Sequence, residues 1–331
     1  MKNLTNLINN KVSINEKNFY TLIIGLNPSQ GARSPRLWNK VYKKKKSNCR
    51  MYPADVSLKN LRNFVNFLKK DEKFLGGSVT APYKIEIMKY LDEIDFNAKK
   101  IGSINTIVKK GNKIKGYNTD YFGAFETLKK IRSNKDILVI GAGGASKAVI
   151  IASVDKFKKS NFFFLNRKKK KLNFIKKINF LKKNKILNKL NDIHSLKNID
   201  LVINTTSVGF DTWVKTKKKV YNLKFFSPFI NLIKMVSIKT SSDRIFKKKN
   251  LKLIKKDSKN LKNFFVNHKK ITIFDIIYKP NKTKLLRFAE KSGKVGHNGL
   301  EMNLIQAVKG FVLVNKNNNF YKVKKIMESH G

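Results

Sequence analysis

The sequence predicts an α/β protein built from two domains. Strand-like and helix-like segments alternate along most of its 331 residues, a pattern typical of sheets with parallel strands. A glycine-rich turn at residues 141–145 follows an apolar strand and opens a helix, as the phosphate-binding turn of a Rossmann-type domain does. The length corresponds to about two average domains. Hydrophobic residues make up 41% of the chain, which is enough to form real cores.

In the first part of the chain, apolar runs and turn residues predict four strands and two helices. The strands are expected at residues 20–26, 74–79, 104–108 and 113–118, and the helices at residues 55–70 and 82–94. Gly111 and Asn112 predict a turn between the last two strands. Proline suits the first position of a helix, so Pro82 would start the second helix and place Lys84 in its first turn. The first helix would bury one apolar stripe: Leu58, Leu61, Phe64, Val65 and Leu68.

The second part of the chain begins near Asn134 and repeats the strand–turn–helix pattern. Strands are expected at residues 136–140, 161–167, 199–204 and 271–280, and helices at residues 146–154 and 299–314. The lysine-rich segment at residues 211–270 has no clear turn signals, so we treat it as an insertion whose order the sequence leaves open. Within it, residues 227–238 fit a strand or a helix equally well, because periodicity does not decide between them.

The chain is strongly basic, with a formal net charge of +52 and a sequence pI near 10.3. Such a charge can indicate a nucleic-acid partner. Lysine, however, is accompanied by many Asn, Ile and Phe, the residues of A/T-rich codons, which indicates compositional drift instead. The lysine runs at residues 43–46 and 168–171 contain no aromatic residues and match no nucleic-acid-binding module. We therefore expect weak, salt-sensitive association with polyanions and no specific nucleic-acid site.

The remaining composition points to a cytoplasmic protein without a metal centre. Cys49 is the only cysteine, so no internal disulfide can form, and this fits a reducing compartment. No segment approaches the roughly 18 unbroken apolar residues of a membrane span, and the N-terminus lacks the apolar core of a signal peptide. The histidines are scattered without the spacing of metal ligands: His194, His268, His297 and His330.

The turn at residues 141–145 predicts a dinucleotide site. Gly141, Gly143 and Ser146 occupy the three fingerprint positions, where small residues let the backbone approach a pyrophosphate at the start of a helix. An NAD site usually has an acidic residue at the end of the next strand for the ribose hydroxyl. Here Asn166, Arg167 and lysines follow that strand, which favours the 2′-phosphate of NADP. Alternatively, the lysines at 168–171 are only a solvated run.

Nine short motifs occur in one order, and together they resemble the shikimate dehydrogenase family. The match covers nearly the whole chain except residues 211–270. The motifs are ARSP at 32–35, SVTAPYK at 78–84, GSINT at 102–106, GYNTD at 116–120, GAGGA at 141–145, NRK at 166–168, NTTSVG at 204–209, DIIYKP at 275–280 and GLEMNLIQ at 299–306.

The resemblance implies an NADP-dependent oxidoreductase that interconverts 3-dehydroshikimate and shikimate. Lys84 would be the catalytic acid and base, with Asp120 as its carboxylate partner. The implied substrate-binding residues are Ser34, Thr80, Asn105, Asp120, Tyr278 and Gln306. The implied cofactor-binding residues are Gly141, Ala142, Gly143, Gly144, Ala145, Asn166, Arg167, Lys168, Ile276 and Gly299.

The resemblance also implies how the two domains are organised. Residues 1–128, together with a C-terminal helix from 299–331 that packs back on them, would form the substrate-binding catalytic domain. Residues 129–298 would form the NADP-binding Rossmann-like domain, which carries the insertion. The implied partner is a small-molecule substrate, with no membrane and no specific nucleic acid, and the chain would be a monomer or a homodimer.

Each candidate also has a purely structural explanation. Lys84 would be a surface lysine, Asp120 and Thr80 would cap helices, and Tyr278 would be a core residue. The other polar candidates would be turn or helix-surface residues: Asn105, Asn118 and Gln306.

The chain also departs from the family pattern at three positions. Ala32 and Ser78 replace a serine and an asparagine, and Trp38 replaces a residue that is commonly histidine. Ala32 cannot donate a hydrogen bond to a substrate carboxylate, and Arg33 or Arg36 could substitute for it. These departures keep open a quinate-preferring dehydrogenase, or a catalytically decayed polyanion-binding protein that retains the fold.

Overall fold

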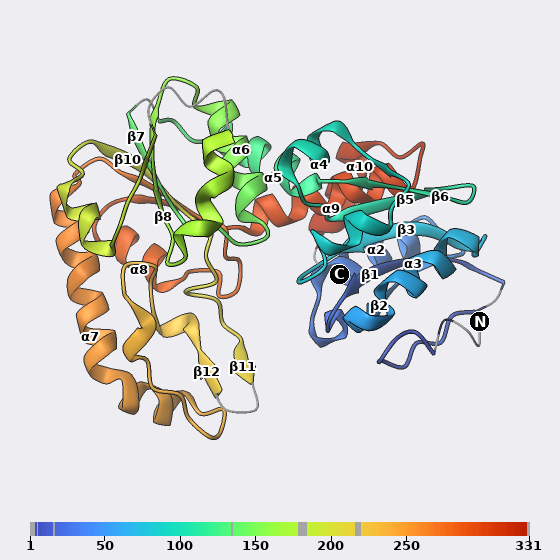
Figure 1. Cartoon of the computed structure of the whole chain (residues 1–331), viewed down its shortest axis with the longest axis horizontal. Coiled ribbons are helices and arrows are strands. Elements are labelled where there is room, and N and C mark those ends of the chain that lie inside the picture. The colour runs from blue at the N-terminus through green and yellow to red at the C-terminus, as the bar shows by residue number, and fades with distance from the viewer. Residues whose placement is uncertain are drawn as a thin grey trace. The chain divides into compact units, whose positions relative to one another are not determined.

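The computed structural model forms two compact units, each built around a six-stranded sheet (Figure 1). Each unit has the α/β architecture that the sequence predicts. Unit 1 comprises Met1–Glu126, Lys147–Ala152 and Met302–Gly331, and unit 2 comprises Thr127–Ser146 and Ser153–Glu301. The structure describes residues 4, 6–15, 17–133, 135–177, 184–215 and 220–329. Asn134 and His330, both named above, lie outside these ranges.

The sheet of unit 1 is mixed, whereas the sequence pattern predicted parallel strands. Its order is β2-β1-β3-β5-β6-β4, and β1 pairs in parallel with both β2 and β3. Strand β5 runs antiparallel to β3, and it runs antiparallel to β6 because the turn at Gly111 and Asn112 closes a tight hairpin. The strands are β1 (Phe19–Gly25), β2 (Cys49–Asp55), β3 (Phe74–Val79), β4 (Glu93–Ile94), β5 (Thr106–Lys110) and β6 (Lys113–Tyr117).

Helices from both ends of the chain cover the sheet of unit 1. The C-terminal helices α9 and α10, red in Figure 1, pack on α2, as the sequence predicted for the end of the chain. Buried Trp38 of α2 donates a 3.1 Å hydrogen bond to the carbonyl of Ala307, and its ring meets Phe311 edge-on at 5.4 Å. The helices are α2 (Arg33–Lys44), α3 (Leu61–Lys70), α4 (Phe96–Ile101), α5 (Thr119–Leu128), α9 (Leu300–Val314) and α10 (Phe320–Glu328).

The helix predicted at residues 82–94 does not form. The chain there makes turns and the short 3-10 helix η3 (Glu86–Tyr90). Long-range bonds explain the difference: the Tyr83 hydroxyl donates to the Val56 carbonyl at 2.6 Å, and the Lys84 carbonyl accepts from the Ile104 N–H at 2.7 Å. The Lys84 carbonyl therefore accepts from Ile104 and is not available for the i+4 bond of an α-helix.

The stripe predicted for the helix at residues 55–70 is correct except at its start. Leu61, Phe64, Val65 and Leu68 are buried in α3, but Leu58 is 60% exposed. Leu58 lies in the short 3-10 helix η2 (Leu58–Asn60), ahead of the α-helical turns. A further 3-10 helix of unit 1 is η1 (Pro28–Gln30).

The sheet of unit 2 is parallel throughout, with the order β14-β13-β10-β7-β8-β9. This confirms the Rossmann-type pattern. Strand β13 is shorter than predicted and ends at Asp275, because the carboxylate of Asp275 accepts the N–H of Ile277 at 3.1 Å and turns the chain out of the sheet. The strands are β7 (Asp136–Ile140), β8 (Asn161–Leu165), β9 (Asn184–Ile186), β10 (Ile199–Asn204), β13 (Thr272–Asp275) and β14 (Val295–His297). Outside residues 211–270, the helices of unit 2 are α8 (Lys284–Lys291), η4 (Lys169–Lys177) and η5 (Leu190–Ser195), together with both ends of α6 (Ser146–Lys156), whose residues Lys147–Ala152 belong to unit 1.

Most of the lysine-rich segment at residues 211–270 is folded. Its main element is the 25-residue helix α7 (Asp243–Asn267), which Ser242 caps through a 3.4 Å bond from the Ile245 N–H. Residues 227–238 are neither strand nor regular α-helix, apart from one 3-10 turn. Residues 216–219 lie outside the described part of the chain. The other elements of this segment are β11 (Trp213–Lys215), β12 (Val220–Asn222), η6 (Leu223–Phe225) and η7 (Leu232–Lys234).

A buried ion pair ties α7 to α8. Lys284 Nζ lies 2.9 Å from Asp257 Oδ2, and the two side chains are only 8% and 0% exposed. The carboxylate of Asp257 also accepts the backbone N–H of Ser227 at 2.8 Å. Burial raises the pKa of Asp257 and lowers the pKa of Lys284, so the hydrogen bonds and the mutual attraction are needed to keep both groups charged.

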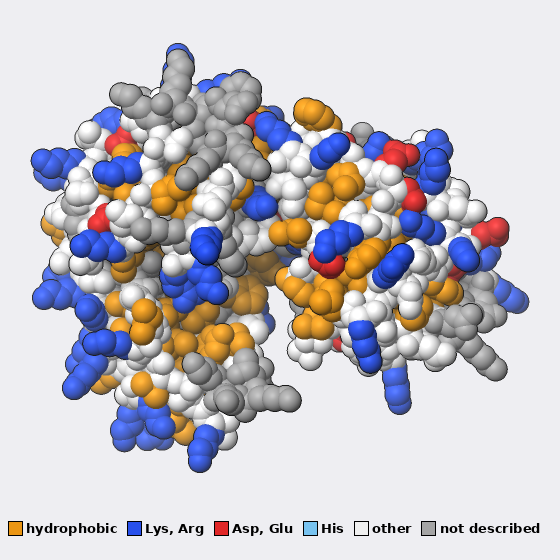
Figure 2. Space-filling view, in the orientation of Figure 1, with side chains coloured by type: hydrophobic (Ala, Val, Ile, Leu, Met, Phe, Trp, Pro, Cys, Tyr) orange, Lys and Arg blue, Asp and Glu red, His pale blue; other side chains and the backbone are white. Residues whose placement is uncertain are grey.

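The positive charge is spread over the surface. On the face drawn in Figure 2, Lys and Arg side chains are scattered over both units, with apolar and uncharged side chains between them. Within the described ranges, none of the helices combines the length and the apolar character that a membrane span requires.

Candidate active site

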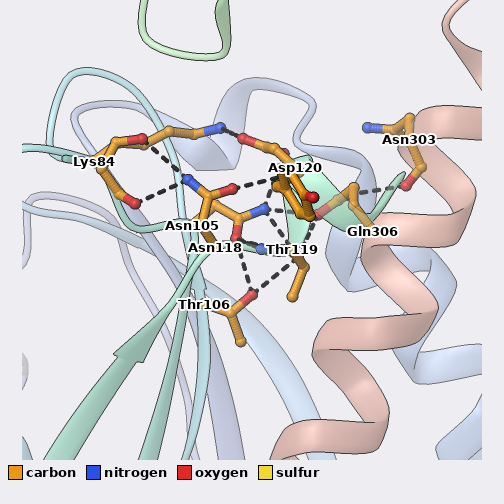
Figure 3. A network of polar contacts seen from close by, with 10 residues as sticks. Lys84, Asn105, Thr106, Asn118, Thr119, Asp120, Asn303 and Gln306 are labelled. Atoms are coloured by element: carbon orange, nitrogen blue, oxygen red, sulfur yellow. Dashed lines mark hydrogen bonds and ion pairs between the residues drawn. The ribbon is translucent and has the colours of Figure 1, made fainter. Parts of the chain in front are cut away.

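A lysine and a carboxylate meet inside unit 1, as the sequence predicted (Figure 3). Lys84 Nζ lies 2.5 Å from Asp120 Oδ2, and the side chains are 18% and 10% exposed. Lys84 belongs to the turn after β3, and Asp120 belongs to the first turn of α5. Partial burial reduces solvent screening, so this pair is more strongly coupled than an exposed ion pair.

The backbone around each member of the pair is anchored. On one side, the bonds of Tyr83 to Val56 and of Ile104 to the Lys84 carbonyl fix the turn. On the other side, Asn118 caps α5, because its Oδ1 accepts the Tyr121 N–H at 3.1 Å.

The explanation that Asp120 only caps α5 is therefore wrong. Asn118 fills the capping position and is itself held through its Nδ2, which donates to the carbonyl of Ser103 at 2.8 Å. The carboxylate of Asp120 is directed to Lys84 and to Asn105 instead.

Asn105 connects the pair to the C-terminal helix α9. Its Nδ2 lies within hydrogen-bond distance of Asp120 Oδ1 at 2.9 Å, Thr119 Oγ1 at 3.0 Å and Gln306 Oε1 at 3.2 Å. Its Oδ1 accepts the backbone N–H of Thr119 at 2.6 Å. Asn105 is 3% exposed, so it requires such partners. The structure thus brings together four of the predicted site residues: Lys84, Asn105, Asp120 and Gln306.

Two other predicted substrate-binding residues of unit 1 lie outside this network in the part of the chain that the structure describes. Ser34 lies in the first turn of α2 and is 8% exposed. Thr80 directly follows β3, and its methyl group packs close to Gly25. Residues 81–85 form turns, and the next helix, η3, has Ile85 at its N-cap position, so the alternative that Thr80 caps a helix is wrong. Tyr278 belongs to unit 2, where it is half-buried and meets the ring of Phe210 edge-on at 5.9 Å.

In unit 2, the glycine turn between β7 and α6 is tightly packed at Gly141 and open at Gly144. Gly141 has a φ of +116°, and a Cβ on it would lie 2.6 Å from Thr205 Oγ1, so no other residue fits without strain. The N–H of Gly143 donates to Ser146 Oγ at 2.6 Å, while a Cβ on Gly144 would meet open space. The turn therefore leaves room for a ligand beside the start of α6, which fits a pyrophosphate.

The residues after β8 fit the 2′-phosphate of NADP. Arg167 and Lys168 are exposed, and no acidic residue occurs between Asn166 and Lys171. Asn166 Nδ2 donates to the carbonyl of Lys168 at 2.8 Å and so fixes the turn that carries both cations. A guanidinium presents paired donors that match a phosphate.

A buried carboxylate organises the loops at the carboxyl ends of β10 and β13. Asp275 is fully buried and accepts hydrogen bonds from Asn204 Nδ2 at 3.0 Å and Thr283 Oγ1 at 2.7 Å. The next residue, Ile276, packs closely against Gly299. A Cβ on Gly299 would lie 1.8 Å from the Ile276 carbonyl oxygen. Asp275 thus holds the loop that carries Ile276 and Tyr278.

Sequence reasoning did not single out Thr119, Asn204 and Asp275, although each lies in a recognised motif. Thr119 touches Asn105, Thr106 and Gln306 through its hydroxyl. A usable signal existed for Asn204 and Asp275, since each ends an apolar strand and the carboxyl ends of neighbouring parallel strands meet at one edge.

Fold and geometry together define a class of protein: a dehydrogenase with a Rossmann-type dinucleotide unit and a second α/β unit that carries a lysine–carboxylate pair. Comparison with protein families agrees with this class. Residues 23–107 match the model of the shikimate dehydrogenase substrate binding domain.

Two relatives that the chain resembles are named shikimate dehydrogenase (NADP(+)). The protein of Methanococcus aeolicus is 33% identical over 301 residues, which cover 89% of this chain and 92% of the relative. The protein of Methanosphaera stadtmanae is 30% identical over 324 residues, which cover 96% and 99%. The chain belongs to the shikimate dehydrogenase family.

Solved structures give the same result. The crystal structure of shikimate dehydrogenase from Aquifex aeolicus is 29% identical, with a TM-score of 0.66, and the match covers 96% of this chain and all of that one. A shikimate dehydrogenase in complex with NADP+ is 27% identical, with a TM-score of 0.67, and the match covers 95% and 96%.

Proposed function

We propose that this protein catalyses the reversible, NADPH-dependent reduction of 3-dehydroshikimate to shikimate, a step of aromatic amino acid biosynthesis by way of chorismate. The observation that carries the proposal is the 2.5 Å contact between Lys84 and Asp120 inside a hydrogen-bonded network. Relatives named shikimate dehydrogenase (NADP(+)), which align with most of the chain, support the same activity.

The chemistry follows from the pair. Reduction of a ketone needs a hydride at carbon and a proton at oxygen, and NADPH supplies the hydride when bound. The Lys84 ammonium donates the proton to the substrate oxygen and takes it back in the reverse direction. Asp120 holds the ammonium in place, and Asn105 holds Asp120 through Oδ1.

The two units divide the work of binding in this proposal. Unit 1 holds the substrate hydroxyls and carboxylate through Ser34, Thr80, Asn105 and Gln306, and Tyr278 of unit 2 adds a phenolic hydroxyl. Unit 2 holds NADP through the turn at Gly141–Ala145, the basic turn at Asn166–Lys168, and the packed loops of Ile276 and Gly299. The open space beside Gly144 and the exposed Arg167 support this assignment.

The chain is also proposed to act in the cytoplasm, as a monomer or homodimer without a specific nucleic-acid partner. Cys49 is buried, and burial raises the pKa of its thiol to about 11, so it stays protonated and unreactive. The described residues contain no group of three or more His, Cys, Asp or Glu side chains that could hold a metal ion. The scattered lysines of Figure 2 support diffuse rather than specific polyanion contact.

The test is an assay of NADPH formation with shikimate and, separately, with quinate. The proposal expects turnover with shikimate and NADP, and much weaker turnover with quinate. Preference for quinate would move the protein to the alternative specificity within the family. Absence of turnover with either acid, together with tight salt-dependent DNA binding, would favour a decayed polyanion-binding protein.

A further inference from the structure

The lysine-rich segment at residues 211–270 builds a small core of its own within unit 2 (Figure 1). Six buried apolar side chains form this core: Val208, Phe226, Ile230, Leu232, Ile238 and Phe246. Trp213 packs against it from β11, and the Trp213 ring meets Phe246 edge-on at 5.8 Å. Val208 lies ahead of the segment, in the loop that follows β10. The core therefore fastens the segment to the loop at the carboxyl end of β10.

Two residues where the segment begins contact the loop that carries Tyr278. The N–H of Asp211 donates to the carbonyl of Lys279 at 2.8 Å. The ring of Phe210 meets the ring of Tyr278 edge-on, with 5.9 Å between the centroids and 81° between the planes. The loop is thus held from the side of the segment as well as from Asp275, whose carboxylate lies at the end of β13.

Side chains of the segment in turn hold Asp211. Its Oδ1 accepts from Asn222 Nδ2 at 3.0 Å and lies 3.1 Å from Lys224 Nζ. Lys224 Nζ also lies 2.6 Å from Asp243 Oδ2 in the first turn of α7. Burial opposes the charge of Lys224, but the two carboxylates outweigh it and raise the pKa of Lys224, so the ammonium bridges them. A continuous series of contacts therefore runs from α7 to the loop of Tyr278.

The support of this loop bears on how Tyr278 presents its hydroxyl. Phe210 and Tyr278 are both half-buried, and neither lies in a helix or a strand. A loop that is ordered before its ligand arrives loses less conformational entropy on binding. Aromatic pairs also prefer particular relative orientations, of which the edge-on arrangement is one. Contact with Phe210 therefore restricts the direction of the Tyr278 hydroxyl.

We propose, building on the function above, that Phe210 and Asp211 are positioning residues for the substrate. Through them, the folded segment at residues 211–270 determines where the Tyr278 hydroxyl meets the substrate. The lysine-rich segment, whose order the sequence leaves open, then has a role in substrate affinity.

The experiment is a double-mutant cycle between Phe210 and Tyr278, measured as KM for shikimate in the NADPH assay with the full chain. Phe210→Leu and Tyr278→Phe each raise KM about 3- to 10-fold, the first by loss of the ring pair and the second by loss of the hydroxyl. The double variant raises KM no more than Tyr278→Phe alone, because Phe210 acts through the hydroxyl that this variant lacks. Phe210→Tyr keeps the ring pair and stays near the wild-type KM.

Trp213→Leu is the matched control, because it removes an edge-on ring of the same segment that contacts Phe246 instead of Tyr278. It lowers the midpoint of thermal unfolding and leaves KM for shikimate unchanged. Asp211→Ala loses the contacts to Asn222 and Lys224 and raises KM less than Phe210→Leu does, since its backbone N–H remains. Hydrogen exchange, measured by mass spectrometry, needs no turnover: the amides of residues 276–279 exchange faster in Phe210→Leu and in Asp211→Ala, but not in Trp213→Leu.

The outcomes separate this inference from the proposed function. Equal rises in KM for Phe210→Leu and Trp213→Leu, or a double variant whose two effects add, would overturn the inference and leave the proposed function standing. A wild-type KM in Tyr278→Phe would overturn it as well, since the hydroxyl would then not meet the substrate. Absence of turnover by the wild type would contradict the proposed function, and unchanged exchange of residues 276–279 in Phe210→Leu would then overturn the inference independently.

Discussion

Lys84 Nζ lies 2.5 Å from Asp120 Oδ2, and Asn105 holds the other oxygen of that carboxylate at 2.9 Å. If Lys84 supplies the proton to the substrate oxygen, the variant Lys84→Ala lowers kcat by about 10²- to 10⁴-fold. Binding of NADP, measured by quenching of protein fluorescence, stays near the wild-type value, because the proposed cofactor residues lie in unit 2.

The matched control for this prediction is Lys89→Ala. Lys89 also pairs with an acid, since its Nζ lies 2.9 Å from Glu86 Oε2, but its side chain is 65% exposed. An exposed pair of this kind is screened by solvent and contributes little to stability. Turnover by Lys84→Ala that matches turnover by Lys89→Ala would refute the assignment of Lys84 as the acid and base.

The choice between NADP and NAD depends on Arg167 in the turn after β8. Removal of the guanidinium in Arg167→Ala is expected to raise KM for NADP about 10- to 100-fold, because one charge-assisted contact to the 2′-phosphate is lost. KM for NAD should change little, since NAD lacks the 2′-phosphate. Steady-state kinetics with both cofactors measures the ratio of the KM values for NADP and NAD.

Lys159→Ala is the control for the cofactor prediction. Lys159 is also exposed, but it precedes β8, which starts at Asn161, and so lies at the opposite end of the strand. An equal loss of NADP affinity in both variants would mean that only the net positive charge of the unit matters.

Two glycines of one turn should respond differently to alanine. In Gly141→Ala, the new Cβ would lie 2.6 Å from Thr205 Oγ1 at a φ of +116°, so the variant loses at least about 1–3 kcal/mol of unfolding free energy. In Gly144→Ala, the Cβ meets nothing within 4 Å, so stability without NADP stays close to that of the wild type. Urea unfolding of the cofactor-free protein measures both values, and equal losses would contradict the described shape of the turn.

The sequence predicted well those elements whose local signals agree with the tertiary structure. Apolar runs and the turn at Gly111–Asn112 predicted β1, β3 and the β5–β6 hairpin at nearly their observed limits. The strand–turn–helix at Gly141 likewise has the expected form. Such elements need no distant partner to be recognised, because turn chemistry and periodicity act within a few residues.

Other features depend on distant contacts that periodicity does not contain. The segment after Pro82 has helical spacing, but bonds to Val56 and Ile104 hold it in turns. Helix α7 was hidden because lysines dominate its exposed face and because two of its buried positions are polar, Asn250 and Asp257. Nothing in the local pattern indicated that Asn118, rather than Asp120, caps α5.

Asp275 makes the stability of the protein depend on pH in an unusual direction. Complete burial raises the pKa of its carboxyl group from 3.8 to about 7, although bonds from Thr283, Ile277 and Asn204 act in the opposite sense. In the unfolded chain the group returns to its ordinary pKa. Between about pH 4 and pH 7 the folded state therefore holds more protons than the unfolded state, and stability falls as the pH rises through this window.

The variant Asp275→Asn should remove this contribution. The amide is neutral at every pH, its oxygen can still accept from Asn204 and Ile277, and its nitrogen can donate to the Thr283 hydroxyl. The urea midpoint of the variant is expected to fall less than that of the wild type between about pH 4 and pH 7, by an amount that corresponds to about 1.4 kcal/mol per unit of pKa difference. Glu72→Gln makes the same exchange at an exposed carboxyl and should leave the wild-type slope unchanged. Parallel slopes for wild type and Asp275→Asn would show that Asp275 is ionised in the folded protein throughout this window, held by its three donors against the effect of burial.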